Sequence, residues 1–231
     1  MENLNLIYKY IRGSHCHGIN TPTSDTDIGG VYLLPNETLL GLGVDYHETK
    51  SNSTNDITYY ELNKFIKLIG KSNPTILEAL FIDDEFILHE SKEIKYIKSY
   101  RDTFITKQCF NTFFGYAQAQ IKKALSDKRC NNRPKYDGYD TKNMCETFRL
   151  LNMGIEIAQG KGVIVNRKNI DGEFLLDIKK NKYSFDYLYN LIEEKQKKFN
   201  MVCESSTLPD KINTNQLNQI LIDIRTNNIL I

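Results

Sequence analysis

The chain has 231 residues, of which 40% are hydrophobic and 26% are charged, proportions typical of a soluble globular protein with one large domain or two modest ones. Thirty basic residues nearly cancel 29 acidic ones, so the net charge of +1 provides no general attraction to nucleic acid and any basic surface must be local. Five scattered cysteines without a CxxC pair argue against a disulfide framework and against a closed four-ligand zinc site.

The first half of the chain shows strand patterns separated by polar turns. Residues 6–12 (LIYKYIR) are rich in aromatic and branched side chains and lead into Gly13-Ser14, which predicts a strand that ends in a turn. A polar loop then precedes a second predicted strand over about 26–35. Residues 36–55 contain many turn formers and are predicted to be loop or hairpin.

Helical periodicity begins after a third strand. Residues 57–61 alternate as on a strand, and apolar residues then recur at helical spacing over 62–69. The pair Asn73-Pro74 is typical of a helix start, because Asn caps the first turn and Pro suits the first helical position.

The second half of the chain carries helical patterns. We therefore predict an α+β protein, with a mixed sheet flanked by helices in a domain of residues 1–105 and a helical substrate-binding domain of residues 106–231. The apolar stripes of the second half predict helices over about 110–125, 141–159, 183–199 and 215–225.

The most informative stretch, residues 12–30, reads RGSHCHGINTPTSDTDIGG. Asp25 and Asp27 are two residues apart, so on a strand or entering one their carboxylates would share a face. Neighbouring carboxylates repel each other unless a cation lies between them, and hard oxygen ligands favour Mg²⁺ or Mn²⁺. Two such ions can activate the attacking oxygen and stabilise the leaving oxygen in phosphoryl transfer. The aspartate pair therefore predicts a divalent metal site.

The Gly13-Ser14 turn predicts a binding site for phosphate beside these acids. Glycine lets the backbone approach a ligand, exposed N–H groups attract an anion, and the serine hydroxyl adds a donor. A third carboxylate is expected to complete the metal shell and to accept a proton from the attacking hydroxyl. Asp56, just before the third predicted strand, is the best candidate, and Glu61 is the second choice because it begins a helix.

These motifs resemble a known family. Gly13-Ser14, ten intervening residues and then DTDI resemble the signature of the DNA polymerase β-like nucleotidyltransferase superfamily. The longer stretch RGSHCHGINTPTSDTDIGGVYLLP is similar to the motif RGSxxxGxxTxxSDxDxxGV of predicted bacterial and phage nucleotidyltransferases linked to RNA repair. The likeness continues in DITYYELNKFIKLIGKSNPTILEALF, in YDTKNMCETFRLLNMGIEIAQGKGVIV and in the SSTLP run near residue 207, so it covers most of the chain.

The resemblance implies a polymerase β-like core followed by a mostly helical region. It also implies roles for five residues of the first half: the metal ligands Asp25, Asp27 and Asp56, which are also the catalytic residues, and the triphosphate-binding residues Gly13 and Ser14.

In the second half, Lys142 and Arg149 match a helix that carries Lys and Arg in the family, which implies contacts to the phosphates of the nucleotide. Glu146 departs from the pattern, since the family often has His four residues after that Lys. Exchange of a potential cation for an acid implies a different substrate contact or a weaker activity.

The predicted function is metal-dependent nucleotidyl transfer (EC 2.7.7). An NTP such as ATP would donate NMP to an acceptor hydroxyl, with RNA or tRNA as the first candidate, and release pyrophosphate. NMP transfer to a protein hydroxyl, as in toxin- or antitoxin-like members, and a catalytically weak nucleotide- or RNA-binding module are the alternatives. We expect a cytoplasmic protein of phage or bacterial type without a membrane partner, because the sequence shows no signal peptide and no apolar run of membrane-spanning length. The preferred base and the oligomeric state stay open.

Other readings of the opening motif compete with these predictions. S-D-T-D is also ordinary turn chemistry. The ligand types of His15, Cys16 and His17 suit zinc, and a zinc hydrolase is a further alternative. Adjacent residues rarely all bind one ion, however, and the sequence offers no nearby fourth ligand, since His47 and His89 are far away along the chain.

Two features of the second half, a basic run and a group of tyrosines, do not by themselves indicate a function. The basic run over 122–135 could follow an RNA backbone, or could be a solvated helix end with cations near its negative pole. The tyrosines at 183, 187 and 189 are at helical spacing, which favours core packing.

Overall fold

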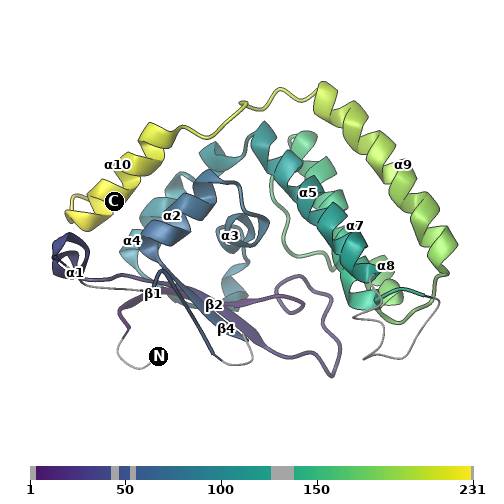
Figure 1. Ribbon diagram of the computed structural model, residues 1–231, viewed down its shortest axis with the longest axis horizontal. Helices are drawn as coiled ribbons and strands as arrows, with labels where there is room; N and C mark the ends of the chain where they lie inside the picture. Colours follow the sequence, from purple (N-terminus) through teal and green to yellow (C-terminus); the bar gives the residue numbers. More distant parts are fainter. Residues whose placement is uncertain (1–3, 43–46, 53–55, 126–137, 230–231) are drawn as a thin grey trace. The chain divides into compact units, whose positions relative to one another are not determined.

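The computed structural model describes residues 4–42, 47–52, 56–125 and 138–229. The chain forms two compact units (Figure 1). One comprises Met1–His17, Thr21–Phe104 and Ile212–Ile231, and the other comprises Gly18–Asn20 and Ile105–Lys211.

The first unit is built on a mixed sheet. In the described part of the chain the strand order is β3-β4-β2-β1-β5. The pair β2 and β4 is parallel, and the other neighbouring pairs are antiparallel. The parallel pair matters for the site, because it aligns the beginnings of two strands at one edge. The strands are β1 (Leu6–Arg12), β2 (Asp27–Tyr32), β3 (Thr49–Ser51), β4 (Ile57–Glu61) and β5 (Ile87–Glu90).

Helices of the first unit pack on this sheet. The helix α2 buries Leu62, Phe65 and Ile69, the apolar positions that recur at helical spacing. The predicted cap of α3 is confirmed, since Asn73 Oδ1 accepts a hydrogen bond from Ile76 N at 3.3 Å and Pro74 is the first helical residue. The helices are α1 (Asn36–Leu40), α2 (Leu62–Gly70), α3 (Pro74–Ala79), α4 (Lys92–Ser99) and α10 (Thr214–Arg225), with 3-10 turns η1 (Asp84–Phe86) and η2 (Arg101–Phe104).

The C-terminal helix α10 returns to the first unit, whereas residues 106–231 were expected to form one helical domain. It contacts α2 and α4 on the side away from the sheet (Figure 1). Leu217 packs against the backbone at Gly70, and the Arg225 guanidinium donates to the buried Glu61 carboxylate. The sequence pattern of α10 predicts an apolar face but not which unit covers that face.

The second unit is helical. In Figure 1 α5 and α7 lie side by side, and α9 contacts α7. Aromatic rings fill the interior: Phe113 and Phe148 are fully buried, and Phe114 stacks on Phe199 with centroids 4.5 Å apart. Its helices in the described residues are α5 (Lys107–Ala124), α7 (Thr141–Ala158), α8 (Gly172–Lys179) and α9 (Phe185–Glu204).

The predicted α+β class is confirmed, with strands in the first half and mostly helices in the second. Predicted loop residues 36–55 contain the short α1 and β3, and β5, α4 and α8 are additional elements. Core packing was the wrong expectation for two tyrosines, since Tyr187 is 48% exposed and Tyr189 is 43% exposed.

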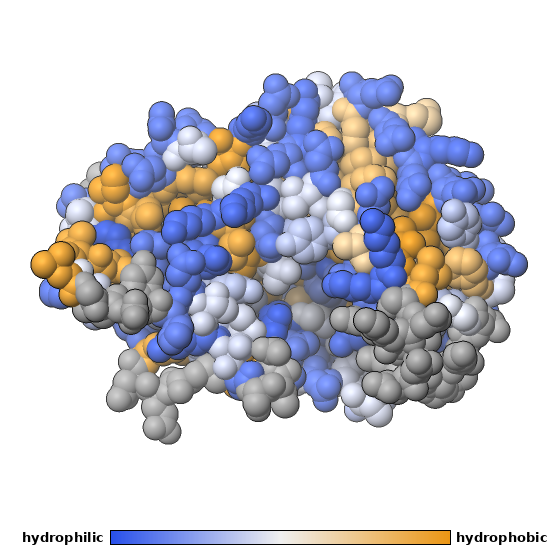
Figure 2. Space-filling view, in the orientation of Figure 1, coloured by the Kyte–Doolittle hydropathy of each residue, from blue (hydrophilic) through white to orange (hydrophobic). Residues whose placement is uncertain are grey.

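The described surface is largely polar. Figure 2 shows hydrophilic residues over much of the visible face, with smaller apolar patches between them. In the described ranges no helix combines the length and the apolar character needed to span a membrane.

Candidate active site

A tight turn follows β1. Gly13 has a positive φ of +74°, a conformation that glycine adopts without steric cost. His17 N–H donates to the Gly13 carbonyl oxygen at 3.2 Å, and Cys16 Sγ lies 3.3 Å from the same oxygen and donates to it. The strand therefore ends in one closed turn of backbone, as the Gly-Ser pair predicts.

This turn lies directly against Asp27. A Cβ atom on Gly13 would be only 2.7 Å from Asp27 Oδ2, so the absent side chain leaves room for the carboxylate. Arg12 is the cross-strand partner of Asp27, and its Nη2 lies 3.9 Å from Asp27 Oδ1. The structure thus brings a predicted phosphate-binding residue and a predicted metal ligand together, with a cation beside them.

Asp56 lies at the same edge of the sheet as Asp27. The parallel strands β2 and β4 pair Ile28 with Ile57, and Ile28 N–H donates to the Asp56 carbonyl oxygen at 2.6 Å. Asp27 and Asp56 each precede one of these paired residues. Arg12 reaches toward the same edge, where its Nη2 donates to Thr58 Oγ1 at 3.4 Å.

Asp25 lies just before β2, which begins at Asp27. It is exposed, and a closed turn precedes it: Ser24 N–H donates to the Thr21 carbonyl oxygen at 2.9 Å, and Thr21 N–H donates to Ser24 Oγ at 2.8 Å. His15 Nε2 donates to the Ser24 carbonyl oxygen at 3.4 Å. This contact ties the Gly13 turn, which includes Ser14, to the residue before Asp25.

The histidines of the motif contact protein groups. His17 is buried, and its Nε2 lies 3.0 Å from Oε2 of the buried Glu78 on α3. In the part of the chain that the structure describes, no set of three His, Cys, Asp or Glu side chains is grouped closely enough to hold a metal ion. The structure therefore gives no support to a zinc site at residues 15–17. It also shows that Asp25, Asp27 and Asp56 do not form one tight group of side chains.

Glu61, the second choice for the third carboxylate, lies at the opposite end of β4 from Asp56. Its side chain is fully buried and accepts hydrogen bonds from Asn63 N at 2.6 Å and from the Arg225 guanidinium. Glu61 therefore caps α2 and anchors α10, and it does not belong to the edge where Asp27 lies.

The two predicted nucleotide contacts of the helical half lie on α7 in the second unit. Lys142 is exposed in the first turn of α7. Arg149 is 3% exposed and its Nε donates to Glu146 Oε2 at 2.9 Å, while Nη1 donates to Met153 Sδ at 3.0 Å. Glu146, the residue that departs from the family pattern, thus binds the guanidinium that was expected to contact phosphate.

Of the predicted basic run, Lys122 and Lys123 are exposed in the last turn of α5. Residues 126–135 lie outside the described part of the chain. Sequence reasoning gave no site role to Arg12, which lies beside Asp27, and interpreted Glu78, the partner of His17, as structural. Their signals were present in RGS and in the NPTILE run, but only the fold shows which residues they contact.

Comparison with known proteins shows the family of the chain. The chain is 28% identical, over an alignment of 128 residues, to the "Uncharacterized 38.9 kDa protein in nrdC-mobD intergenic region" of Enterobacteria phage T4, and the alignment covers 51% of the chain and 38% of that protein. The match thus spans well under half the length of the relative. The model of RlaP, the RNA repair pathway DNA polymerase beta family, matches residues 1–223. The chain therefore belongs to the RNA repair pathway DNA polymerase beta family.

Proposed function

We propose that the protein transfers NMP from an NTP to a hydroxyl group of RNA. Family membership supports a nucleotidyltransferase-like role in RNA repair. The observation that carries the finer proposal is the position of Gly13 against Asp27, with Asp56 at the same sheet edge. In the reaction the acceptor oxygen bonds to the α-phosphorus, the bond from that phosphorus to the bridging oxygen breaks, and pyrophosphate leaves.

The donor chemistry at this edge fits Mg²⁺ or Mn²⁺. Asp27 and Asp56, assisted by Asp25, would hold the ions through carboxylate oxygens, and the missing side chain at Gly13 keeps the Asp27 carboxylate accessible. When bound, the ions supply positive charge that offsets the triphosphate and lowers the pKa of the acceptor hydroxyl.

Phosphate binding, charge stabilisation and proton transfer are assigned to groups of the protein. The backbone N–H groups after Gly13 and the Ser14 hydroxyl bind the phosphates of the leaving pyrophosphate. Arg12 adds a fixed positive charge beside Asp27. Asp56 accepts the proton of the attacking hydroxyl.

A catalytically weak nucleotide- or RNA-binding module is the second candidate. One observation favours it: the Arg149 guanidinium is bound by Glu146, which leaves one cation fewer for phosphate. The lead proposal rests on the first unit, where all three aspartates are present.

The test is a labelling experiment. The protein is incubated with Mg²⁺, each of four α-³²P-labelled NTPs in turn, and a mixture of RNA and protein. We expect label in RNA. Label in protein would replace the RNA acceptor by a protein hydroxyl, and NTP binding without any transfer would favour the weak module.

The matched control uses the aspartates. The double substitution Asp25→Ala, Asp27→Ala is expected to lower transfer by at least about a thousandfold, because ligand loss removes metal-assisted stabilisation. Asp102→Ala, at an exposed aspartate in η2, should transfer at the wild-type rate. Transfer that persists in the double variant would refute the assignment.

A further inference from the structure

The second unit contains a pocket of about 470 Å³ that none of the predicted site residues lines. Its walls come from α7, from the segment before α8, from the first turn of α8, and from α9. The residues that matter for its chemistry are Asn152, Lys168, Ile170, Asp171, Phe174 and Lys195.

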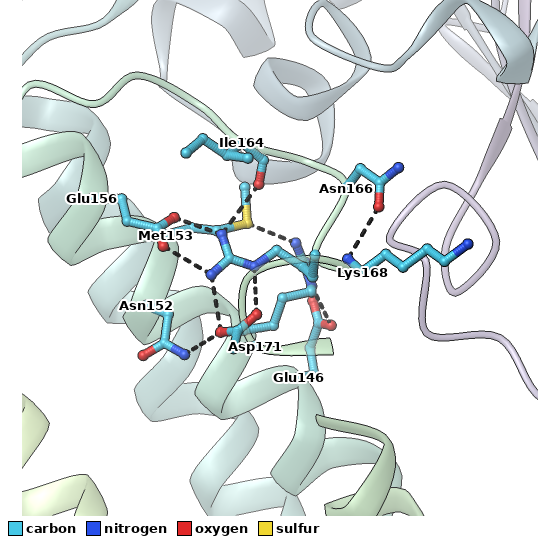
Figure 3. Close-up of polar contacts among 10 residues, drawn as sticks. Glu146, Asn152, Met153, Glu156, Ile164, Asn166, Lys168 and Asp171 are labelled. Carbon is cyan, nitrogen blue, oxygen red and sulfur yellow. Dashed lines mark hydrogen bonds and ion pairs between the residues drawn. The ribbon is translucent and has the colours of Figure 1, made fainter. Parts of the chain in front are cut away.

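A buried arginine fixes the walls of this pocket. Arg167 is fully buried, and its Nε and Nη2 donate to the two carboxylate oxygens of Asp171 at 2.8 and 2.9 Å. Its Nη2 also donates to Glu156 Oε1 at 2.9 Å, and its Nη1 donates to the Ile164 carbonyl oxygen at 3.3 Å. The carboxylates of Glu156 and Asp171 both bind this guanidinium, and Figure 3 labels these two acids together with Asn152, which donates to Asp171. The Asp171 carboxylate is therefore occupied by protein donors.

Two lysines supply the open charges of the pocket. Lys168 is exposed, and Lys195 is half-buried on α9. In the described residues neither ammonium group has a hydrogen-bond or ion-pair partner. Burial lowers the pKa of Lys195 below its usual value, although Asp171 partly opposes this effect. A half-buried ammonium group without a partner favours an anion that can replace its lost hydration. Glu173 is the exposed acid among the lining residues.

Aromatic rings continue from the pocket along the surface. The Phe174 ring in the pocket wall lies 5.4 Å from the Tyr183 ring, which in turn stacks on Tyr187 with centroids 5.3 Å apart and planes at 27°. Tyr187 is 48% exposed, and the lining residue Ile170 is 49% exposed. Exposed rings next to lysines are the combination that binds single-stranded nucleic acid, because bases stack on rings while phosphates meet cations.

We propose that this pocket binds one nucleotide of a single-stranded RNA acceptor. The base lies against Ile170 and Phe174, the adjoining phosphate lies between Lys168 and Lys195, and the neighbouring base stacks on Tyr187. The choice of RNA rests on the proposed function. A single strand suits the site better than a duplex does, because paired bases are stacked on one another and offer no free face to a ring.

The test measures RNA binding without catalysis. Fluorescence anisotropy of a labelled 12-nucleotide single-stranded RNA is followed without NTP or Mg²⁺, over a range of salt concentrations. The variant Lys168→Ala, Lys195→Ala should bind about tenfold more weakly and should show a salt dependence shallower by about one unit of log–log slope. Tyr187→Ala should bind about tenfold more weakly with an unchanged slope, because it removes stacking and no charge. Glu173→Gln should bind more tightly.

The matched control is the variant Lys161→Ala, Lys197→Ala, which removes two exposed lysines of the same unit that do not line the pocket. It should bind RNA like the wild type. Equal losses in the two lysine pairs would show general electrostatic attraction and overturn the proposal, as would unchanged binding in the pocket variants or equal affinity for duplex RNA. Thermal unfolding of each variant checks that the fold persists.

Failure of this proposal and failure of nucleotidyl transfer are distinguishable. The variant Asp25→Ala, Asp27→Ala should bind the RNA normally while its NMP transfer falls by at least about a thousandfold. If the wild type binds RNA through the pocket but transfers no NMP, the RNA-binding role of the pocket would stand and the proposed nucleotidyl transfer would be refuted. If the pocket variants bind RNA and transfer NMP to it as the wild type does, nucleotidyl transfer would be supported and the pocket proposal refuted.

Discussion

At Gly13 the backbone has a φ of +74°, and the space where a side chain would begin is taken by the Asp27 carboxylate at 2.7 Å. Most positions in a turn tolerate alanine, but this one combines a left-handed conformation with a contact to a functional group. The glycine therefore allows both the left-handed backbone of the turn and the close approach of the Asp27 carboxylate.

The substitution Gly13→Ala should destabilise the protein by about 1 kcal/mol and displace the Asp27 carboxylate. We expect NMP transfer to fall about a hundredfold, since small misplacements of reacting groups cost rates of this order. Gly115→Ala is the matched control, because Gly115 lies in α5 with open space around its Cβ position. Steady-state kinetics and urea unfolding check both variants, and equal transfer rates for the two would contradict this role of Gly13.

At the scale of elements, α3 holds the turn after β1. The His17 ring in the turn and the Glu78 carboxylate on α3 are both buried and lie 3.0 Å apart, although 61 residues separate them in the chain. The Asn73-Pro74 start of α3 thus also fixes the position of the Glu78 carboxylate, which contacts the His17 ring.

Glu78→Ala should raise the KM for NTP about tenfold and leave kcat nearly unchanged, because the turn loses its anchor while the aspartates stay in place. Glu78→Gln keeps a hydrogen-bonding oxygen and should recover most of the affinity. Purely structural damage would instead lower the folded fraction and leave the KM of the remaining enzyme intact. Kinetics of both variants, together with thermal unfolding, separate these outcomes.

At the scale of the whole molecule, local signals predicted the elements with strong patterns of their own, and missed α1, α4, α8, β3 and β5. The aromatic and branched residues of β1, the Asn73-Pro74 cap and the apolar stripe of α5 each specify an element through their own neighbours. The return of α10 to the first unit was not predictable, because Leu217 and Arg225 find their partners in a distant part of the chain.

The site follows the same rule. The spacing from Gly13 to Asp27 identified the residues that the fold brings together. The charge of Arg12 beside Asp27 depends on cross-strand register, and the exposure of Tyr187 depends on which face of α9 is covered, so neither could be read from spacing alone. Predictions from sequence were strongest for contacts within a motif and weakest for contacts between elements.

The central claim is that the sheet edge at Asp27 and Asp56 holds divalent ions together with a nucleotide. Electron paramagnetic resonance of Mn²⁺ in the presence of a non-hydrolysable NTP analogue measures this most directly. The wild type and the Asp102→Asn control should bind Mn²⁺ alike, and Asp27→Asn and Asp56→Asn should each weaken its binding by at least about tenfold. Undiminished Mn²⁺ binding in both variants would contradict the account.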